Sequence, residues 1–174
     1  MENMVLKSLK ERRSIRRYEA RQVEEDKLRT ILEVGTYAAT GRNKQAPVIV
    51  AVQDPATREV LRRMNAAVMG ALDMDPFYGA PTVLVVLADR TVSTHLEDGA
   101  LVLGNLMNAA HAVGLASCWI HRAREEFESE EGKALLKSWG IVGDYVGVGH
   151  LALGYAAIDL PAAAPRKKNY IYRV

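Results

Sequence analysis

Apolar residues along the chain alternate between a helical period and short unbroken runs. Between Glu24 and Tyr37, apolar or small residues recur from Leu28 at i+3, i+4 and i+7, which predicts an amphipathic helix. The runs Val48 to Val52 and Thr82 to Ala88 are rich in β-branched residues and predict strands, the second covered on both faces. This alternation is typical of a layered α/β or α+β domain.

The same pattern predicts the remaining elements. Further helices are expected over Val5 to Lys10, Pro55 to Met69, Leu96 to Val113 and Glu125 to Trp139, and further strands over Ala116 to Ile120 and Tyr145 to Tyr155. Asp54 and Thr94 are suited to cap the helices that follow them. Arg12 to Gln22 is predicted to be an irregular arm, and Ala39 to Pro47 a loop. The helix Leu96 to Val113 has apolar or small residues on almost every side, so we expect a second subunit to cover part of it.

The end of the chain also points to a partner subunit. Pro161 to Pro165 predicts an extended connector, and Asn169 to Val174 has strand character. A strand after a stiff spacer could pair with the sheet edge of another subunit, because an edge strand presents unpaired backbone groups.

Composition limits the class of protein. The 174 residues are 49% hydrophobic and 25% charged, which favours one globular domain over residues 1–174 and excludes disorder and coiled coil. An acid at Glu2 and the lack of a long apolar run lead us to expect no signal peptide, no membrane span and a cytoplasmic protein. The single cysteine, Cys118, can form no disulfide within the chain and is expected to be a small core residue.

Basic residues cluster at both ends of a nearly neutral chain. The formal net charge is only +2, so we expect no nucleic-acid partner, although an arginine cluster beside Tyr18 is the feature that such a partner would use. Arg12 to Arg17 holds four arginines, and Arg166 to Lys168 is a second basic group. Several guanidinium groups with the Ser14 hydroxyl suit a phosphate, so the two clusters would have a common purpose if the fold brings them to one anion. Without such convergence, they are solvated surface.

Other candidate motifs carry less chemistry. Gly147 to Ala152 fits the G-x-G-x-x-A dinucleotide fingerprint, but apolar residues continue through it as a strand, so we reject a Rossmann site. The four histidines lack ligand spacing, and no metal site is expected. The acids of Glu125 to Glu131 are interpreted as the solvent-facing side of a helix. Asn43 and Gln45 could bind the edge of a heterocycle with alternating carbonyl and N–H groups, or could be ordinary turn residues.

Five segments in order resemble the nitroreductase family of FMN-dependent oxidoreductases. They are Arg12-Arg13-Ser14-Ile15-Arg16, Ala39-Thr40-Gly41-Arg42-Asn43-Lys44-Gln45, Gly79-Ala80-Pro81, Gly114-Leu115-Ala116-Ser117-Cys118-Trp119-Ile120 and Leu151-Ala152-Leu153-Gly154-Tyr155. The resemblance implies an α+β fold with a central, mostly antiparallel sheet flanked by helices. It also implies an intertwined homodimer with C-terminal strand exchange and two FMN molecules at the subunit interface.

The resemblance also implies which residues bind FMN. Arg12, Arg13, Ser14 and Arg16 would hold the phosphate, ribityl chain and pyrimidine side, with Arg166 and Lys168 closing on the phosphate. The loop residues Ala39, Thr40, Gly41, Asn43 and Gln45 would join the site, with Thr40, Gly41 and Asn43 coming from the other subunit. Asn65 would meet the pyrimidine edge, and the backbone of Trp119, Ile120, His121 and Arg122 would pass near the flavin ring.

The chain departs from the family pattern in the 39–47 loop and after Cys118, and the departures at Gly41 and Trp119 bear on the site. Family members often have a serine where this chain has Gly41, so one contact is expected either to be absent or to come from backbone. Trp119 stands where several members have proline, which would reshape the pocket beside the ring.

The implied activity is ping-pong transfer of hydride from NAD(P)H through FMN to a small planar electrophile, such as a nitroaromatic or quinone. FMN carries the hydride, so no catalytic side chain is assigned, and Tyr37, Tyr78 and His121 are candidate proton donors. The alternatives are a specialised flavin reaction, such as dehalogenation or enone reduction, and a non-catalytic FMN-binding carrier or sensor.

Overall fold

A computed structural model describes residues 3–174 of the chain, so Met1 and Glu2, part of the argument against a signal peptide, lie outside the described residues. The elements in chain order are α1 (Met4–Glu11), α2 (Glu25–Thr36), the 3-10 turn η1 (Gly41–Asn43), β1 (Pro47–Val52), α3 (Pro55–Met69), β2 (Thr82–Asp89), α4 (His95–Ala112), β3 (Ala116–Ile120), α5 (Ala123–Glu128), α6 (Glu130–Ser138) and β4 (Tyr145–Gly154). This confirms the predicted order of helices and strands, with boundaries that differ by one or two residues at most ends.

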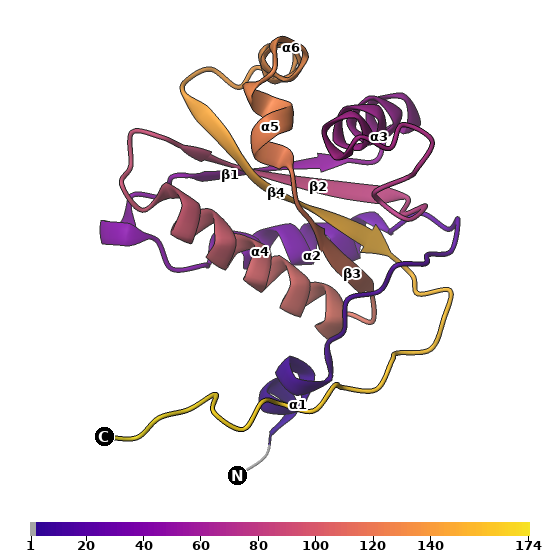
Figure 1. Cartoon of the computed structure of the whole chain (residues 1–174), viewed down its shortest axis with the longest axis vertical. Helices are drawn as coiled ribbons and strands as arrows, with labels where there is room; N and C mark the ends of the chain where they lie inside the picture. Colours follow the sequence, from indigo (N-terminus) through magenta and orange to yellow (C-terminus); the bar gives the residue numbers. More distant parts are fainter. Residues whose placement is uncertain (1–2) are drawn as a thin grey trace.

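The four strands form one antiparallel sheet in the order β1-β2-β4-β3. Helices α2 and α4 cover one face, and α3, α5 and α6 cover the other (Figure 1). The expected α+β architecture with a mostly antiparallel sheet is therefore confirmed. β4 contains the stretch Gly147 to Ala152, so the G-x-G-x-x-A match is a strand, as expected, and opens no helix.

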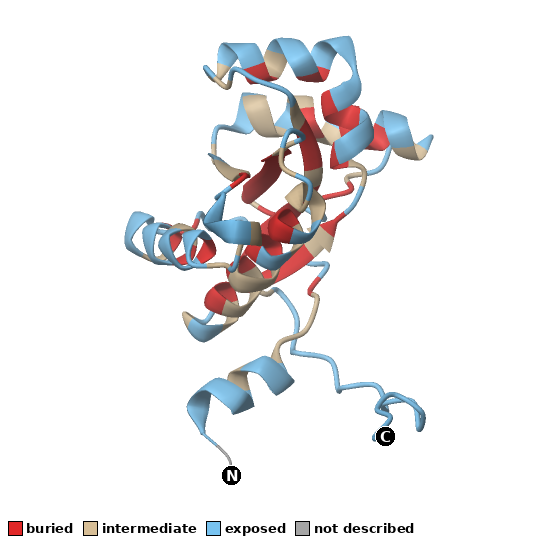
Figure 2. Ribbon diagram, turned by 90° about the vertical axis from the view of Figure 1, so that its left-hand side faces the viewer, coloured by how far each residue is buried: buried red, intermediate tan, exposed pale blue. Residues whose placement is uncertain are grey.

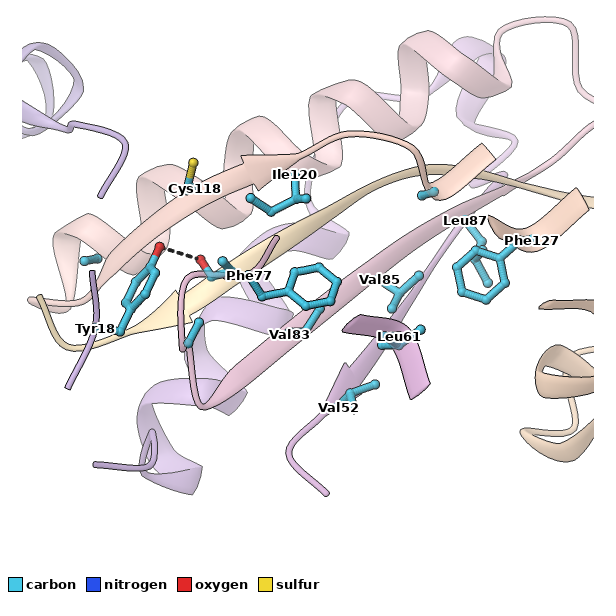
Figure 3. Packing of buried hydrophobic residues seen from close by; sticks show 14 of the residues in the cluster. Tyr18, Val52, Leu61, Phe77, Val83, Val85, Leu87, Cys118, Ile120 and Phe127 are labelled. Atoms are coloured by element: carbon cyan, nitrogen blue, oxygen red, sulfur yellow. Dashed lines mark hydrogen bonds between the residues drawn. The ribbon is translucent and has the colours of Figure 1, made fainter. Parts of the chain in front are cut away.

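The alternation along β2 explains why its sequence is apolar at every position. Val83, Val85 and Leu87 contact the cluster under α3 and α5, together with Phe77 and Phe127 (Figure 3). The intervening Leu84 and Val86 contact the cluster under α2 and α4. Both faces of β2 are thus buried, as predicted.

Two local predictions are wrong. The single helix expected from Glu125 to Trp139 is two helices, α5 and α6, because Ser129 has extended backbone with ψ 158°. Its hydroxyl accepts a hydrogen bond from Gly132 N and caps α6. Thr94 precedes α4 but does not cap it, since its hydroxyl donates to the Asp98 carboxylate at 3.1 Å. Asp54 does cap α3, accepting from Thr57 N at 2.7 Å.

The predicted arm, residues 12–22, lies beside the β3 end of the sheet. Ile15 N donates to Ser117 O at 3.1 Å, and Glu19 N donates to Tyr155 O at 3.0 Å. The buried Tyr18 hydroxyl donates to Ile15 O, and its hydrogen bonding within the core is visible in Figure 3. The arm is therefore fixed along the edge opposite β1.

Helix α1 and the C-terminal tail extend away from this core (Figure 2). α1 buries none of its described residues, and residues 157–174 are exposed and form no strand within the described chain. Exposed apolar side chains such as Ile171 and Tyr172 lie along the tail. On α4, Leu101 is 51% exposed. Strand exchange by the tail and a subunit contact on α4 remain predictions.

Candidate functional site

The basic clusters from the two ends of the chain meet in one groove. Arg12 and Arg13 line it from the arm, and Arg166 lines it from the tail together with Ala163 and Ala164. The groove has a volume of about 610 Å³. Arg166 is held by hydrogen bonds from Nε and Nη2 to Ala164 O, at 3.1 and 2.7 Å. More than 150 residues of sequence therefore separate cationic groups that the fold places together.

Two guanidinium nitrogens of residues that line this groove are buried without an acceptor among the described residues. They are Arg12 Nη1 and Arg13 Nε. The neighbouring Arg13 Nη1 donates to Lys10 O and Arg12 O at 2.7 and 2.8 Å, which fixes the guanidinium plane. Buried charged donors normally have partners, and an anion with several oxygens, such as a phosphate, is a kind of ligand that guanidinium groups bind. Lys168 is exposed two residues beyond Arg166.

Ser14 and Arg16 lie next to Cys118 on β3. Burial raises the pKa of the Cys118 thiol above its usual value, and the nearby Arg16 charge and Ser14 hydroxyl only partly oppose this. The thiol is 2% exposed and packs in the core, which confirms the expected core role (Figure 3). Ser14 and Arg16 thus offer a hydroxyl and a guanidinium a short way along the arm from the Arg12–Arg13 groove.

The loop at residues 39–45 has an unusual backbone. Arg42, Asn43 and Gln45 have φ values of 52°, 54° and 50°, in the left-handed region that non-glycine residues seldom adopt. The conformation is held by Gly41 N donating to Asp98 Oδ1 at 2.9 Å and by Gln45 N donating to Thr40 Oγ1 at 3.2 Å. Held backbone strain of this kind is typical of binding loops.

Gly41 is needed for its close approach to α4. A Cβ at this position would lie 2.2 Å from Thr94 Oγ1, well inside van der Waals contact. A serine here would therefore need Thr94 to move. The departure from the family pattern has a packing cause in this chain, and the backbone of the loop is what remains available for a ligand.

The arm and this loop lie at opposite edges of the sheet. The arm follows β3, whereas the loop leads directly into β1, and the strand order places these two strands at the two ends (Figure 1). A single chain thus does not bring Arg12 and Asn43 together.

The turn after β3 holds the last group of predicted site residues. Ile120 is buried, His121 is exposed, and Arg122 is half-buried with φ 80°. The Trp119 indole lies over Gly149, where a Cβ would be 2.5 Å from Nε1, so Trp119 packs on the α4 side of the sheet.

Asn65 is fully buried on α3, and its side chain binds protein groups in this turn. Its Nδ2 donates to His121 O at 2.9 Å and to Glu126 Oε1, and its Oδ1 accepts from Arg122 Nε at 2.9 Å. Glu126 is 1% exposed, so the interpretation of all acids from Glu125 to Glu131 as solvent-facing is wrong at this position. It pairs with the equally buried His150, to which sequence reasoning gave no role. A buried glutamate and histidine leave no spacing signal, since they lie on different elements.

Residues 3–174 contain no cluster of three or more histidine, cysteine or acidic side chains suited to a metal ion. No helix in the same residues is long and apolar enough to cross a membrane.

Comparison with known proteins identifies the family. The model for the nitroreductase family matches residues 9–155. A relative from Archaeoglobus fulgidus, whose name pairs NADH dehydrogenase with NAD(P)H nitroreductase, is 31% identical over 155 residues, or 86% of this chain and 84% of that protein. A Thermus thermophilus protein named NADH dehydrogenase is 33% identical over 149 residues, or 86% of this chain and 66% of that protein.

A solved structure agrees with the sequence comparisons. The crystal structure of a Bacteroides fragilis nitroreductase with bound FMN has a TM-score of 0.90 and is 31% identical. The match covers 99% of this chain and 100% of that one. On sequence and fold together, the chain belongs to the nitroreductase family.

Proposed function

We propose that this protein is an FMN-dependent oxidoreductase that passes hydride from NAD(P)H to a small planar electrophile, such as a nitroaromatic or quinone. The observation that carries the proposal is the pair of buried, unpartnered guanidinium nitrogens in a groove shared with Arg166. In a family member, such donors fit the phosphate of FMN, because a phosphate can accept from several forked cations at once.

Each group in the arm has a distinct task under this proposal. Arg12, Arg13 and Arg166 bind the phosphate, and Lys168 adds charge from the tail. Ser14 and Arg16 extend along the ribityl chain towards the pyrimidine side of the ring. There the positive charge of Arg16 stabilises negative charge that develops on reduction, which favours electron acceptance.

The other half of the site is proposed to come from a second copy of the chain. Ala39, Thr40, Gly41, Asn43 and Gln45 would reach the flavin of the partner subunit. Two observations support this arrangement. The loop lies at the sheet edge opposite the arm, and hydrogen bonds within the chain hold its left-handed backbone in place. The protein is thus proposed to act as a homodimer.

The backbone from Trp119 to Arg122 would run beside the flavin ring, where an N–H group can donate to it. When bound, FMN supplies the hydride chemistry, with donor and acceptor occupying the same face in turn. The chain supplies orientation, charge and exclusion of water. This chemistry needs no nucleophilic side chain, which is consistent with the burial of Cys118 and the raised pKa of its thiol.

Anaerobic stopped-flow mixing of the purified, flavin-loaded protein with NADH and with NADPH tests the proposal. We expect the absorbance of oxidised flavin to bleach with at least one nucleotide and to return when a quinone or nitroaromatic is added. Stable flavin binding without bleaching by either nucleotide would refute the reductase and favour a carrier or sensor. Protein that stays colourless after incubation with FMN would refute flavin binding itself.

A further inference from the structure

Three polar side chains are buried together between the sheet and helices α3 and α5. They are Asn65 on α3, Glu126 on α5 and His150 on β4, with exposed fractions of 0%, 1% and 0%. The imidazole lies edge-on to Phe77, with ring centroids 5.3 Å apart, and 6.1 Å from Phe127. An ionisable pair thus occupies the middle of an otherwise apolar layer.

One carboxylate oxygen receives both neighbouring donors. His150 Nε2 donates to Glu126 Oε1 at 2.8 Å, and Asn65 Nδ2 donates to the same oxygen. Within residues 3–174, Glu126 Oε2 and His150 Nδ1 have no hydrogen-bond partner. Because a carboxylate oxygen can only accept, the contact between His150 Nε2 and Glu126 Oε1 requires the tautomer with the proton on Nε2.

A contribution to stability does not by itself explain the buried Glu126–His150 pair. Burying a carboxylate with one oxygen unsatisfied is costly, and well-packed apolar residues of similar volume commonly do as well or better. The contacts of Asn65 indicate another reason. Its carboxamide connects the buried pair to the turn after β3 through His121 O and Arg122 Nε, each at 2.9 Å.

The connection fixes both the backbone and the guanidinium of that turn. Arg122 has φ 80°, a conformation that costs free energy in a non-glycine residue and persists only where neighbours hold it. Its guanidinium is held through Nε, and within the described part of the chain no hydrogen bond engages its Nη nitrogens. Those donors are therefore presented at a fixed angle and remain available to a ligand.

We propose that Glu126 and Asn65 are positioning residues that act through Arg122 on the redox properties of the bound flavin. Glu126 orients the Asn65 carboxamide, and Asn65 then holds the His121–Arg122 turn and the Arg122 guanidinium beside the ring. This inference rests on the proposed function. The expectation was that Asn65 itself contacts the pyrimidine edge of FMN. Its amide instead binds protein groups, so under this inference Asn65 affects the flavin only through Arg122.

The test measures the midpoint potential of the flavin in the FMN-loaded protein against a reference dye. Asn65→Leu and Glu126→Leu remove the connection, and we expect each to reduce the preference for the reduced flavin about tenfold, which is about 30 mV for a two-electron couple. Glu126→Gln keeps an oxygen that can accept from both donors, so we expect it to stay within about threefold of wild type. Met64→Leu, a buried change on the same helix outside the connection, is the matched control and should leave the potential unchanged.

A double-mutant cycle separates positioning from general loss of packing. If Asn65 acts through Arg122, then Arg122→Ala alone should show the tenfold effect, and adding Asn65→Leu should change the potential by less than about threefold more. Fully multiplicative effects, or a wild-type potential in Asn65→Leu or in Arg122→Ala, would overturn the inference. A wild-type potential in Arg122→Ala would overturn the inference even if the core variants do not fold. Wild-type protein unable to bind FMN would instead refute the proposed function and this inference with it.

Discussion

Removing one guanidinium from the groove at the two chain ends should weaken FMN binding through its phosphate. Arg12 and Arg166 line the groove from opposite ends of the chain, and Arg12 Nη1 is buried without a partner. A hydrogen bond to a charged group contributes about 1.5–3 kcal/mol. Arg12→Ala or Arg166→Ala should therefore raise the Kd for FMN about 10- to 150-fold, since about 1.4 kcal/mol corresponds to a factor of ten.

Riboflavin supplies the control on the ligand side, because it is FMN without the phosphate. Flavin-free protein is titrated with FMN and with riboflavin, following the change in flavin fluorescence. For wild type, FMN should bind much more tightly than riboflavin. For the two variants this difference should shrink, while the riboflavin Kd should stay within about threefold of wild type. Arg17→Ala, an exposed change on the same arm, is the protein control and should alter neither Kd.

The two ligands make the outcome decisive. An equal loss of affinity for FMN and riboflavin would mean that the arginines shape the groove rather than bind the phosphate. An unchanged Kd for FMN in both variants would remove the phosphate site from this groove altogether.

Three further outcomes are expected. Gly147→Ala should lower the free energy of unfolding by about 1–3 kcal/mol, measured by urea denaturation, because its Cβ would lie 2.1 Å from a backbone oxygen of α5. Hydrogen bonds from the Tyr155 hydroxyl, from backbone and from Arg21 hold the pKa of Glu24 down at about 2, below its unfolded value, so this stability is present above pH 4.5 and is lost as pH falls towards 2. Tyr155→Phe should therefore lose less stability than wild type between pH 6 and pH 3, compared by urea midpoints. Deleting residues 161–174 should convert the proposed dimer to monomer in sedimentation velocity and abolish FMN retention.

The fold was largely predictable because its elements follow local rules. β2 is apolar at successive positions since helices cover both of its faces, and Asp54 followed by Pro55 begins α3 as capping chemistry predicts. The break at Ser129 was missed because the apolar period continues across it. A serine inside an amphipathic pattern is compatible with one helix or two. In the two-helix arrangement Gly132 lies so close to α5 that a Cβ there would be 2.1 Å from Glu126 O.

The sequence supported only a conditional prediction that the basic clusters at the two ends of the chain meet. Two basic clusters suggested a common anion, but their separation in sequence carries no information about distance in space. The resemblance to a family supplied the convergence, and the structure places Arg12, Arg13 and Arg166 in the same groove. The backbone of the 39–45 loop was beyond prediction, since three non-glycine residues there adopt a conformation that their side chains disfavour.

The buried hydrogen bonds that connect His150 to Arg122 could not be predicted from the sequence. Glu126 lies in a run of acids whose other members face solvent, so charge patterning assigns it to the surface. What buries it is a set of donors from α3 and β4, which approach only after the sheet and both helices are packed. The burial of the Glu126 carboxylate therefore depends on the packing of α3, α5 and β4 together. Its effect on the turn after β3 can be deduced only from the hydrogen bonds of Asn65.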